Sequence, residues 1–130
     1  MKRLADLIPG DWRSIIFADG ADLNSPGIYE WKVDGVSVYV GKFTKGYRPR
    51  REYCRNVFKL CNGLPYRPGN LDGFRWIHRR LAHAYRAGST IEVVILENCP
   101  TSQHRERENF HRKLRGLRDG GDASEFALGF

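Results

Sequence analysis

A strand–turn–strand pattern in the first third of the chain restricts the fold more than any other feature. Residues 27–33 (GIYEWKV) alternate as a β-strand does, and residues 36–40 (VSVYV) read as a second strand. Between them lies Asp34-Gly35, a dipeptide typical of two-residue hairpin turns. The sequence therefore predicts an antiparallel β-hairpin over residues 27–40.

The rest of the chain predicts helices around this hairpin. Pro49 suits the first turn of a helix, and Gly88 suits the end of another. Residues 1–25 read as an irregular or short helical lead-in. We expect an α+β fold in which a small, mainly antiparallel three-stranded sheet is flanked by helices, in the order β-β-α-α-β-α. The further elements expected are helices over Pro49–Leu60, Gly73–Arg86 and Thr101–Leu117, and a strand over Ile91–Leu96.

A length of 130 residues suits one domain, with a core over 26–117 and a tail over 118–130. No apolar run is long enough for a membrane helix, and no signal-type run follows the N-terminus, so we expect a soluble, cytoplasmic protein that contacts no membrane. The three cysteines form no CxxC pair and favour neither a disulfide framework nor a cysteine zinc site.

The positive charge is concentrated in the middle of the chain. The net charge is +7, yet residues 27–90 hold thirteen lysines and arginines against four acids, interleaved with tyrosines, phenylalanines and tryptophans. Cations mixed with aromatic rings are typical of surfaces that follow a phosphate backbone. The alternative is a basic face that serves only solubility. We favour DNA as the partner, with RNA not excluded.

Two tripeptides on the hairpin match a known signature. Gly27-Ile28-Tyr29 lies on the first strand and Tyr39-Val40-Gly41 on the second, and a lysine follows directly. An arginine-bearing helix, a strand and the segment Arg107-Glu108-Asn109-Phe110 come later in the chain. This arrangement resembles the GIY-YIG nuclease superfamily over about residues 26–117. The resemblance implies a hydrolase that cuts phosphodiester bonds as an endonuclease with Mg²⁺ or Mn²⁺ as cofactor.

The metal ligand implied by the resemblance is a glutamate on the last helix. Mg²⁺ prefers oxygen ligands and keeps several waters, so one carboxylate can be enough. Position alone leaves Glu106 and Glu108 nearly equal, and a solvated helix face of alternating charge is the plain alternative. The family pattern has an aromatic residue two positions after the glutamate, and Phe110 therefore selects Glu108.

Three tyrosines and a lysine receive catalytic roles from the same resemblance. Tyr29 would act as general base or orient the water, and Tyr39 would position water or phosphate. Tyr53 would take the second acid–base position. A phenol with a pKa of about 10 is a poor base unless cations lower it, and Lys42 would supply such a charge. Without the resemblance, all three tyrosines read as ordinary strand or core residues.

The catalytic arginine is less determined. The family has an arginine four residues before a histidine or tyrosine on one helix, but the residue four before Tyr53 is Pro49. Arg50, three before Tyr53, shares its helix face and is chosen to grip the scissile phosphate. Arg48 and Arg51 remain alternatives. The residues expected to bind nucleic acid are Lys45, Arg48, Arg51, Arg55, Arg75 and Arg79.

The histidines are weaker candidates for functional residues. His78 reads better as a buried, hydrogen-bonded residue than as a phosphate contact, and the spacing of His104 and His111 does not fit a zinc pair. The leading hypothesis is a metal-dependent DNA endonuclease in which Glu108 holds the metal. The alternative is a non-catalytic nucleic-acid-binding module on the same fold. Specificity in either case would draw on a partner protein or an oligomer.

Overall fold

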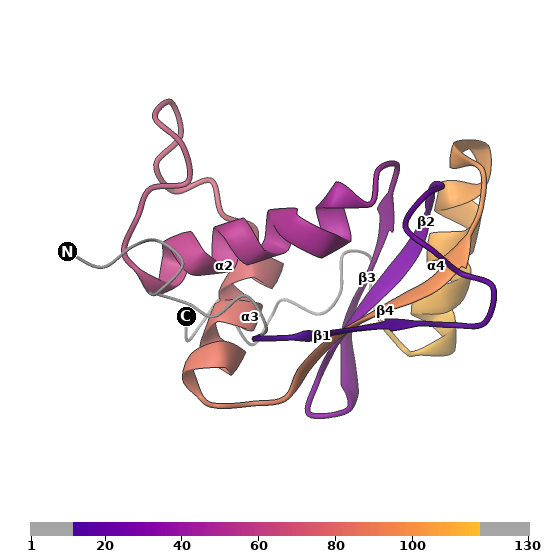
Figure 1. The fold of residues 1–130 in the computed structure, drawn as a ribbon, viewed down its shortest axis with the longest axis horizontal. Coiled ribbons are helices and arrows are strands. Elements are labelled where there is room, and N and C mark those ends of the chain that lie inside the picture. The colour runs from indigo at the N-terminus through magenta and orange to yellow at the C-terminus, as the bar shows by residue number, and fades with distance from the viewer. Residues whose placement is uncertain (1–11, 118–130) are drawn as a thin grey trace.

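A four-stranded mixed sheet forms the centre of the structure, a computed structural model that describes residues 12–117 (Figure 1). The strand order across the sheet is β1-β4-β2-β3. β2 pairs antiparallel with both β3 and β4, whereas β1 runs parallel to β4. The strands span Ser14–Phe17 (β1), Gly27–Val33 (β2), Val36–Phe43 (β3) and Ile91–Asn98 (β4).

The predicted hairpin is confirmed, and two of the three strand pairings are antiparallel, but the described sheet has four strands where three were expected, and its fourth strand pairs in parallel. The fourth strand lies in the supposed lead-in, where Ser14 pairs with Glu92 and Phe17 with Ile95. This strand is only four residues long and is stabilised by pairing with β4, which is distant in the sequence. Its own residues therefore give little strand signal. The fold class is α+β, as expected. The first part of the predicted lead-in, residues 1–11, and the predicted tail, residues 118–130, lie outside the described residues.

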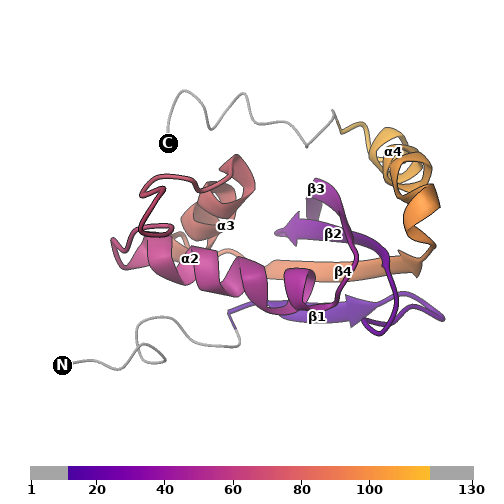
Figure 2. The ribbon, with the colours of Figure 1, turned by 90° about the horizontal axis from the view of Figure 1, so that it is seen from above.

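Helices cover both faces of this sheet, with α2 and α3 on one side and α4 on the other (Figures 1 and 2). Successive strand residues point to opposite faces. Tyr29 and Trp31 of β2 therefore pack among α2 and α3, and Glu30 between them bonds to Arg115 just after α4. The helical segments span Arg48–Glu52 (η1), Tyr53–Cys61 (α2), Trp76–Arg86 (α3), Thr101–Gln103 (η2) and His104–Leu114 (α4).

The first helix has an unexpected beginning. The residues from Arg48 to Glu52 form a π-helical turn, and the α-helix proper starts at Tyr53. A π turn bonds each residue to the fifth one along, so it holds about one more residue per turn than the periodicity of an α-helix assumes.

Among residues 12–117 no helix is long and apolar enough to cross a membrane.

Candidate active site

A cluster of three tyrosines and one arginine lies between β2, β3 and the helices α2 and α3. The Tyr29 and Tyr53 hydroxyls are hydrogen-bonded to each other, and both side chains are completely buried. The Arg75 guanidinium donates to the Tyr39 hydroxyl at 2.5 Å and to the Tyr53 hydroxyl at 3.5 Å. One connected chain of polar groups therefore joins three predicted catalytic tyrosines to a residue predicted only to bind nucleic acid.

The glycines of the two tripeptides make room for this cluster. Tyr29 lies opposite Gly41 in the β2–β3 register, and a Cβ at Gly41 would lie 2.6 Å from the Tyr29 ring and hydroxyl. A Cβ at Gly27 would lie 2.3 Å from the carbonyl oxygen of Glu97 on β4. Carbon atoms in contact are normally about 3.5–4.0 Å apart. Space, and not backbone conformation, therefore requires glycine at both positions.

Burial holds the tyrosines in their neutral form. Desolvation raises the pKa of Tyr29 well above its ordinary value, and the neighbouring hydroxyls of Tyr53 and Tyr39 raise it further. Burial likewise raises the pKa of Tyr53, although Arg75 and Arg48 oppose this. A phenol of raised pKa holds its proton and acts through hydrogen bonds. The raised pKa and complete burial of Tyr29 therefore argue against a general-base role for its hydroxyl.

The His78 side chain is hydrogen-bonded to the backbone of Arg75. Its Nδ1 accepts a hydrogen bond of 3.1 Å from the Arg75 backbone N–H at the start of α3, and its Nε2 lies 3.4 Å from the Asn56 amide nitrogen. Burial and then the guanidiniums of Arg75, Arg48 and Arg79 lower the pKa of His78 to about 3. The prediction of a buried, hydrogen-bonded histidine is confirmed, and its neutral ring fixes the first turn of α3.

An open hollow of about 460 Å³ borders the end of β3. Lys42, directly after the second tripeptide, faces His104 of α4 across it, and Tyr47 and Arg48 line it from the side of η1. The hollow thus joins the two helical layers around the sheet edge. Its complete lining is Lys42, Thr44, Lys45, Tyr47, Arg48, Glu52 and His104.

Arg48 and Arg50 line different hollows. Arg48 is five residues before Tyr53, the spacing that one π turn aligns, and it lines the hollow beside β3. Its charge lowers the pKa of both Tyr53 and His78. Arg50 instead lines a second hollow, together with Arg13.

The other predicted nucleic-acid contacts divide between several surfaces. Arg51 and Arg55 line the second hollow, of about 470 Å³, with Arg50. Arg79 is paired at 2.5 Å with Asp72 in the loop before α3. Lys45 lines the hollow beside β3, and Arg75 belongs to the tyrosine cluster. The structure therefore groups Lys45 with Arg48, and Arg51 with Arg55, and places Arg79 apart from both groups.

Glu108, the predicted metal ligand, is 8% exposed and pairs with Arg112 at 3.1 Å through one carboxylate oxygen. One turn earlier on α4, His104 is buried, and its Nε2 has no hydrogen-bond partner among the described residues. Sequence reasoning set His104 aside, although its spacing of four from Glu108 puts both on one helix face. Glu106 is exposed. Within residues 12–117, no three His, Cys, Asp or Glu side chains gather as a metal-binding group.

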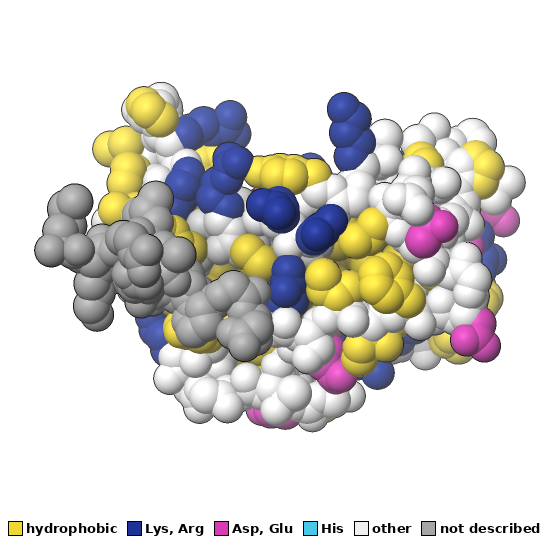
Figure 3. Space-filling model, in the orientation of Figure 1, with side chains coloured by type: hydrophobic (Ala, Val, Ile, Leu, Met, Phe, Trp, Pro, Cys, Tyr) yellow, Lys and Arg dark blue, Asp and Glu magenta, His cyan; other side chains and the backbone are white. Residues whose placement is uncertain are grey.

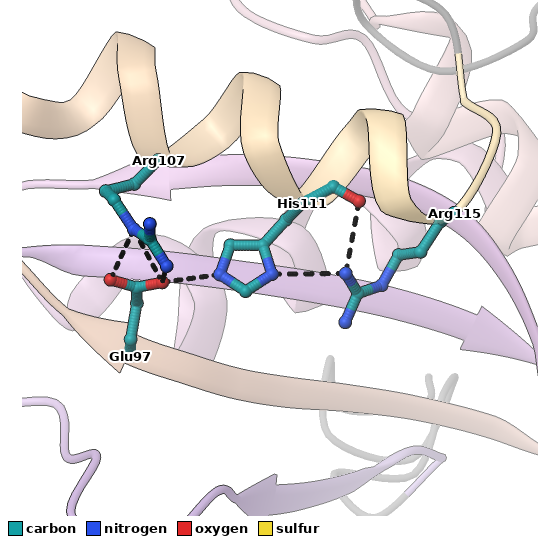
Figure 4. Close-up of polar contacts among 4 residues, drawn as sticks. All are labelled: Glu97, Arg107, His111 and Arg115. Carbon is teal, nitrogen blue, oxygen red and sulfur yellow. Dashed lines mark hydrogen bonds and ion pairs between the residues drawn. The ribbon is translucent and has the colours of Figure 1, made fainter.

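A network of charged side chains fastens α4 to the sheet (Figure 4). Arg107 donates to both oxygens of Glu97 on β4 at 2.7–3.0 Å, and His111 Nε2 meets the same carboxylate at 2.5 Å. Arg115 donates to His111 Nδ1 at 3.1 Å and to Glu30 on β2 at 2.5 Å. These contacts lower the pKa of Glu97, chiefly through Arg107. They fix the rotation of α4 and hence the direction in which Glu108 faces.

Comparisons with known proteins add no relative: no protein-family model, curated protein or solved structure matches this chain.

Proposed function

We propose that this chain is a divalent-metal-dependent endonuclease that hydrolyses phosphodiester bonds in DNA. The observation that carries the proposal is the hydrogen-bonded cluster of Tyr29, Tyr39, Tyr53 and Arg75. Phosphodiester hydrolysis needs a positioned water and cations that stabilise the charge developing on the phosphate. The cluster offers hydroxyls to position water, and the neighbouring hollow offers cations for the phosphate.

Each side chain then has a part that follows from its surroundings. Arg75 is the least buried member of the cluster and is the group that a phosphate oxygen meets. Arg48 and Lys42 line the adjoining hollow and would contact the same phosphate or its neighbours. Tyr39 shares the Arg75 guanidinium and would orient the attacking water. Tyr29 and Tyr53, completely buried, hold Tyr39 and Arg75 in place and keep their protons.

The residues present fit one hard cation at most. Glu108 is a buried carboxylate with one oxygen engaged by Arg112, and Mg²⁺ needs few protein ligands because it retains waters. Glu108 would hold Mg²⁺ or Mn²⁺, and the cation would supply charge stabilisation at the phosphate. The other residues of the proposed site need no contact with it to bind the phosphate and orient the water.

One observation favours a second candidate, the non-catalytic nucleic-acid-binding module. The ion pair between Glu108 and Arg112 satisfies part of the carboxylate that a metal would need. In this alternative, Glu108 serves only to hold α4 together, and the cationic hollows bind DNA without cutting it.

The test is cleavage of supercoiled plasmid in Mg²⁺, Mn²⁺ or EDTA. Glu108→Gln removes the charge that holds the metal, and Glu106→Gln removes an exposed charge on the same helix as a matched control. We expect metal-dependent nicking by the wild type and by Glu106→Gln, and none by Glu108→Gln, with both variants folded by circular dichroism. Gel shift without nicking, for the wild type in both metals, would instead support the binding module.

A further inference from the structure

Three cations and a tyrosine lie along the outer side of the first helix. Tyr47, Arg51 and Arg55 line one hollow, and Lys59 follows Arg55 about one α-helical turn later on α2. The first three are exposed, while Tyr53 and Val57 on the opposite face are buried in the core. Figure 3 shows lysine and arginine side chains gathered over this helix.

Tyr47 borders several hollows. It lines the hollow beside β3 with Lys42 and the second hollow with Arg51. It also lines a third, narrower hollow of about 230 Å³ over α2. The second hollow contains four arginines, and no carboxylate of the described residues lines it. The third is lined by Tyr47, Glu52, Arg55, Asn56, Lys59, Tyr66 and Arg67.

Two tyrosine–arginine pairs border the third hollow. The Arg55 guanidinium lies 5.7 Å from the centre of the Tyr47 ring and donates to its hydroxyl. The Arg67 guanidinium lies 4.7 Å from the centre of the Tyr66 ring and donates to its hydroxyl at 3.2 Å. Each ring is thus held in a fixed direction by a cation. The Tyr47 ring is 44% exposed, whereas Tyr66 is half-buried and also packs against Phe74. Exposed rings flanked by cations are the surfaces on which unpaired bases stack, so Tyr47 is the main stacking ring.

We propose that the surface formed by Tyr47, Arg51, Arg55, Lys59 and Tyr66 binds a single-stranded segment of DNA next to the bond that is cut. This rests on the proposed function only for the location of that bond. The substrate class is then DNA in which an unpaired strand adjoins the cleavage point.

The chemistry distinguishes an unpaired strand from a duplex. In a duplex the bases are stacked inside the helix, and a protein surface meets mainly phosphates and groove edges. The arginines of this surface would serve either form, but the exposed Tyr47 ring can stack on a base only when bases are splayed out. Because Tyr47 also borders the hollow with Lys42, a strand stacked on it continues toward the proposed active site.

The experiment measures binding separately from cleavage. Fluorescence anisotropy in EDTA compares a single-stranded oligonucleotide of about 12 nucleotides, within the range one small domain covers, with the blunt duplex of the same sequence. The variants are Tyr47→Ala, Tyr47→Phe and, as a matched control, Phe110→Ala. Phe110 is an exposed ring under an arginine on α4, away from this surface. Polyglutamate serves as a competitor that carries charge without bases.

We expect Tyr47→Ala to bind the single strand roughly 5- to 150-fold more weakly, which corresponds to the loss of one stacked base. Tyr47→Phe keeps the ring but loses the hydrogen bond from Arg55, so it should lose less affinity than Tyr47→Ala. Phe110→Ala should bind the single strand as the wild type does, and duplex binding should not change in any variant. Equal losses on the single strand and the duplex, no loss in Tyr47→Ala, or competition by polyglutamate as strong as by single-stranded DNA would each overturn the proposal.

A cleavage assay distinguishes the proposed single-strand surface from the proposed nuclease activity. If the chain cuts DNA, a duplex with an unpaired arm should be cut faster than the blunt duplex by the wild type, and Tyr47→Ala should lose this preference. A chain that shows the expected binding pattern but never cuts contradicts only the nuclease. A chain that cuts both substrates equally, with Tyr47→Ala indistinguishable from the wild type, contradicts only the single-strand surface.

Discussion

Replacing Gly41 by alanine should distort the proposed site without removing any of its functional groups. The added Cβ would lie 2.6 Å from the Tyr29 ring and 2.8 Å from the Tyr39 ring, about 1 Å closer than carbon atoms normally approach. The Tyr29 ring has no room to retreat, because the Phe43 ring centre lies 6.2 Å away and the Tyr53 ring centre 5.6 Å away. Either the ring or the β3 backbone must move by about 1 Å.

Two magnitudes follow from that displacement. Over-packing a buried contact costs about 1–3 kcal/mol, so the free energy of unfolding of Gly41→Ala should fall by about 2 kcal/mol. A misplacement of about 1 Å in catalytic groups costs on the order of 10²-fold in rate, so plasmid nicking should slow by about that factor. Urea unfolding followed by tryptophan fluorescence measures the first, and the nicking assay measures the second.

Two controls test whether the Tyr29 ring is the cause. At Gly69 a Cβ would meet nothing within 4 Å, so Gly69→Ala should change neither quantity. In a Tyr29→Leu background, the cost of Gly41→Ala should shrink, because the clashing ring is gone; a double-mutant cycle measures this coupling. A Gly41→Ala protein within about 0.5 kcal/mol of the wild type and nicking at the wild-type rate would refute the steric argument.

Three further predictions concern the surroundings of the site. Tyr29→Phe removes one hydroxyl of the buried pair with Tyr53, which should cost about 1 kcal/mol in urea unfolding. Because that hydroxyl holds Tyr53 and, through it, Arg75 in place, nicking should also slow, by up to about 10²-fold. His78 has a pKa lowered from 6.5 to about 3, so below about pH 6.5 the unfolded chain binds the extra proton and the folded chain does not. From about pH 7.5 to about pH 5, the wild type should therefore lose about 2 kcal/mol more unfolding free energy than His78→Gln does, and equal losses would contradict the neutral buried ring. Glu97→Gln weakens the charged contacts that fasten α4 and should lower the unfolding free energy by about 2 kcal/mol, whereas Glu92→Gln on the same strand should leave it unchanged.

Much of the fold could be predicted because its signals are local. The hairpin follows from alternation around Asp34-Gly35, and the helix ends follow from residues such as Pro49 and Gly88. The segment Ser14–Phe17 is different, because it is a strand only through its parallel pairing with β4. Pairing with a strand so distant in the sequence leaves no periodicity in four residues. The sequence prediction therefore lacks this fourth strand and the parallel pairing that it makes.

The motif spacing predicted that the three tyrosines lie together, but no sequence signal predicted which arginine joins them. Tyr29, Tyr39 and Tyr53 come together as the motif spacing suggested. Arg75 joins them from a loop between two helices, where no local pattern marks which side chain turns inward. The choice of Arg50 assumed α-helical periodicity before Tyr53. The π turn adds a residue there, and no signal in the sequence distinguishes it from an ordinary first turn.

The position of β4 has a consequence for how the chain assembles during synthesis. β4 lies inside the sheet, between β1 and β2, but among the strands of residues 12–117 it is synthesised last. A nascent chain that stops before Ile91 holds a hairpin and a detached β1, each with unpaired edges that invite aggregation. The hairpin itself closes in about 1–10 μs, whereas pairing Ser14 with Glu92 must close a loop of most of the domain, so insertion of β4 should limit the folding rate. Co-translational folding of this domain therefore has to wait until Asn98 has left the ribosome.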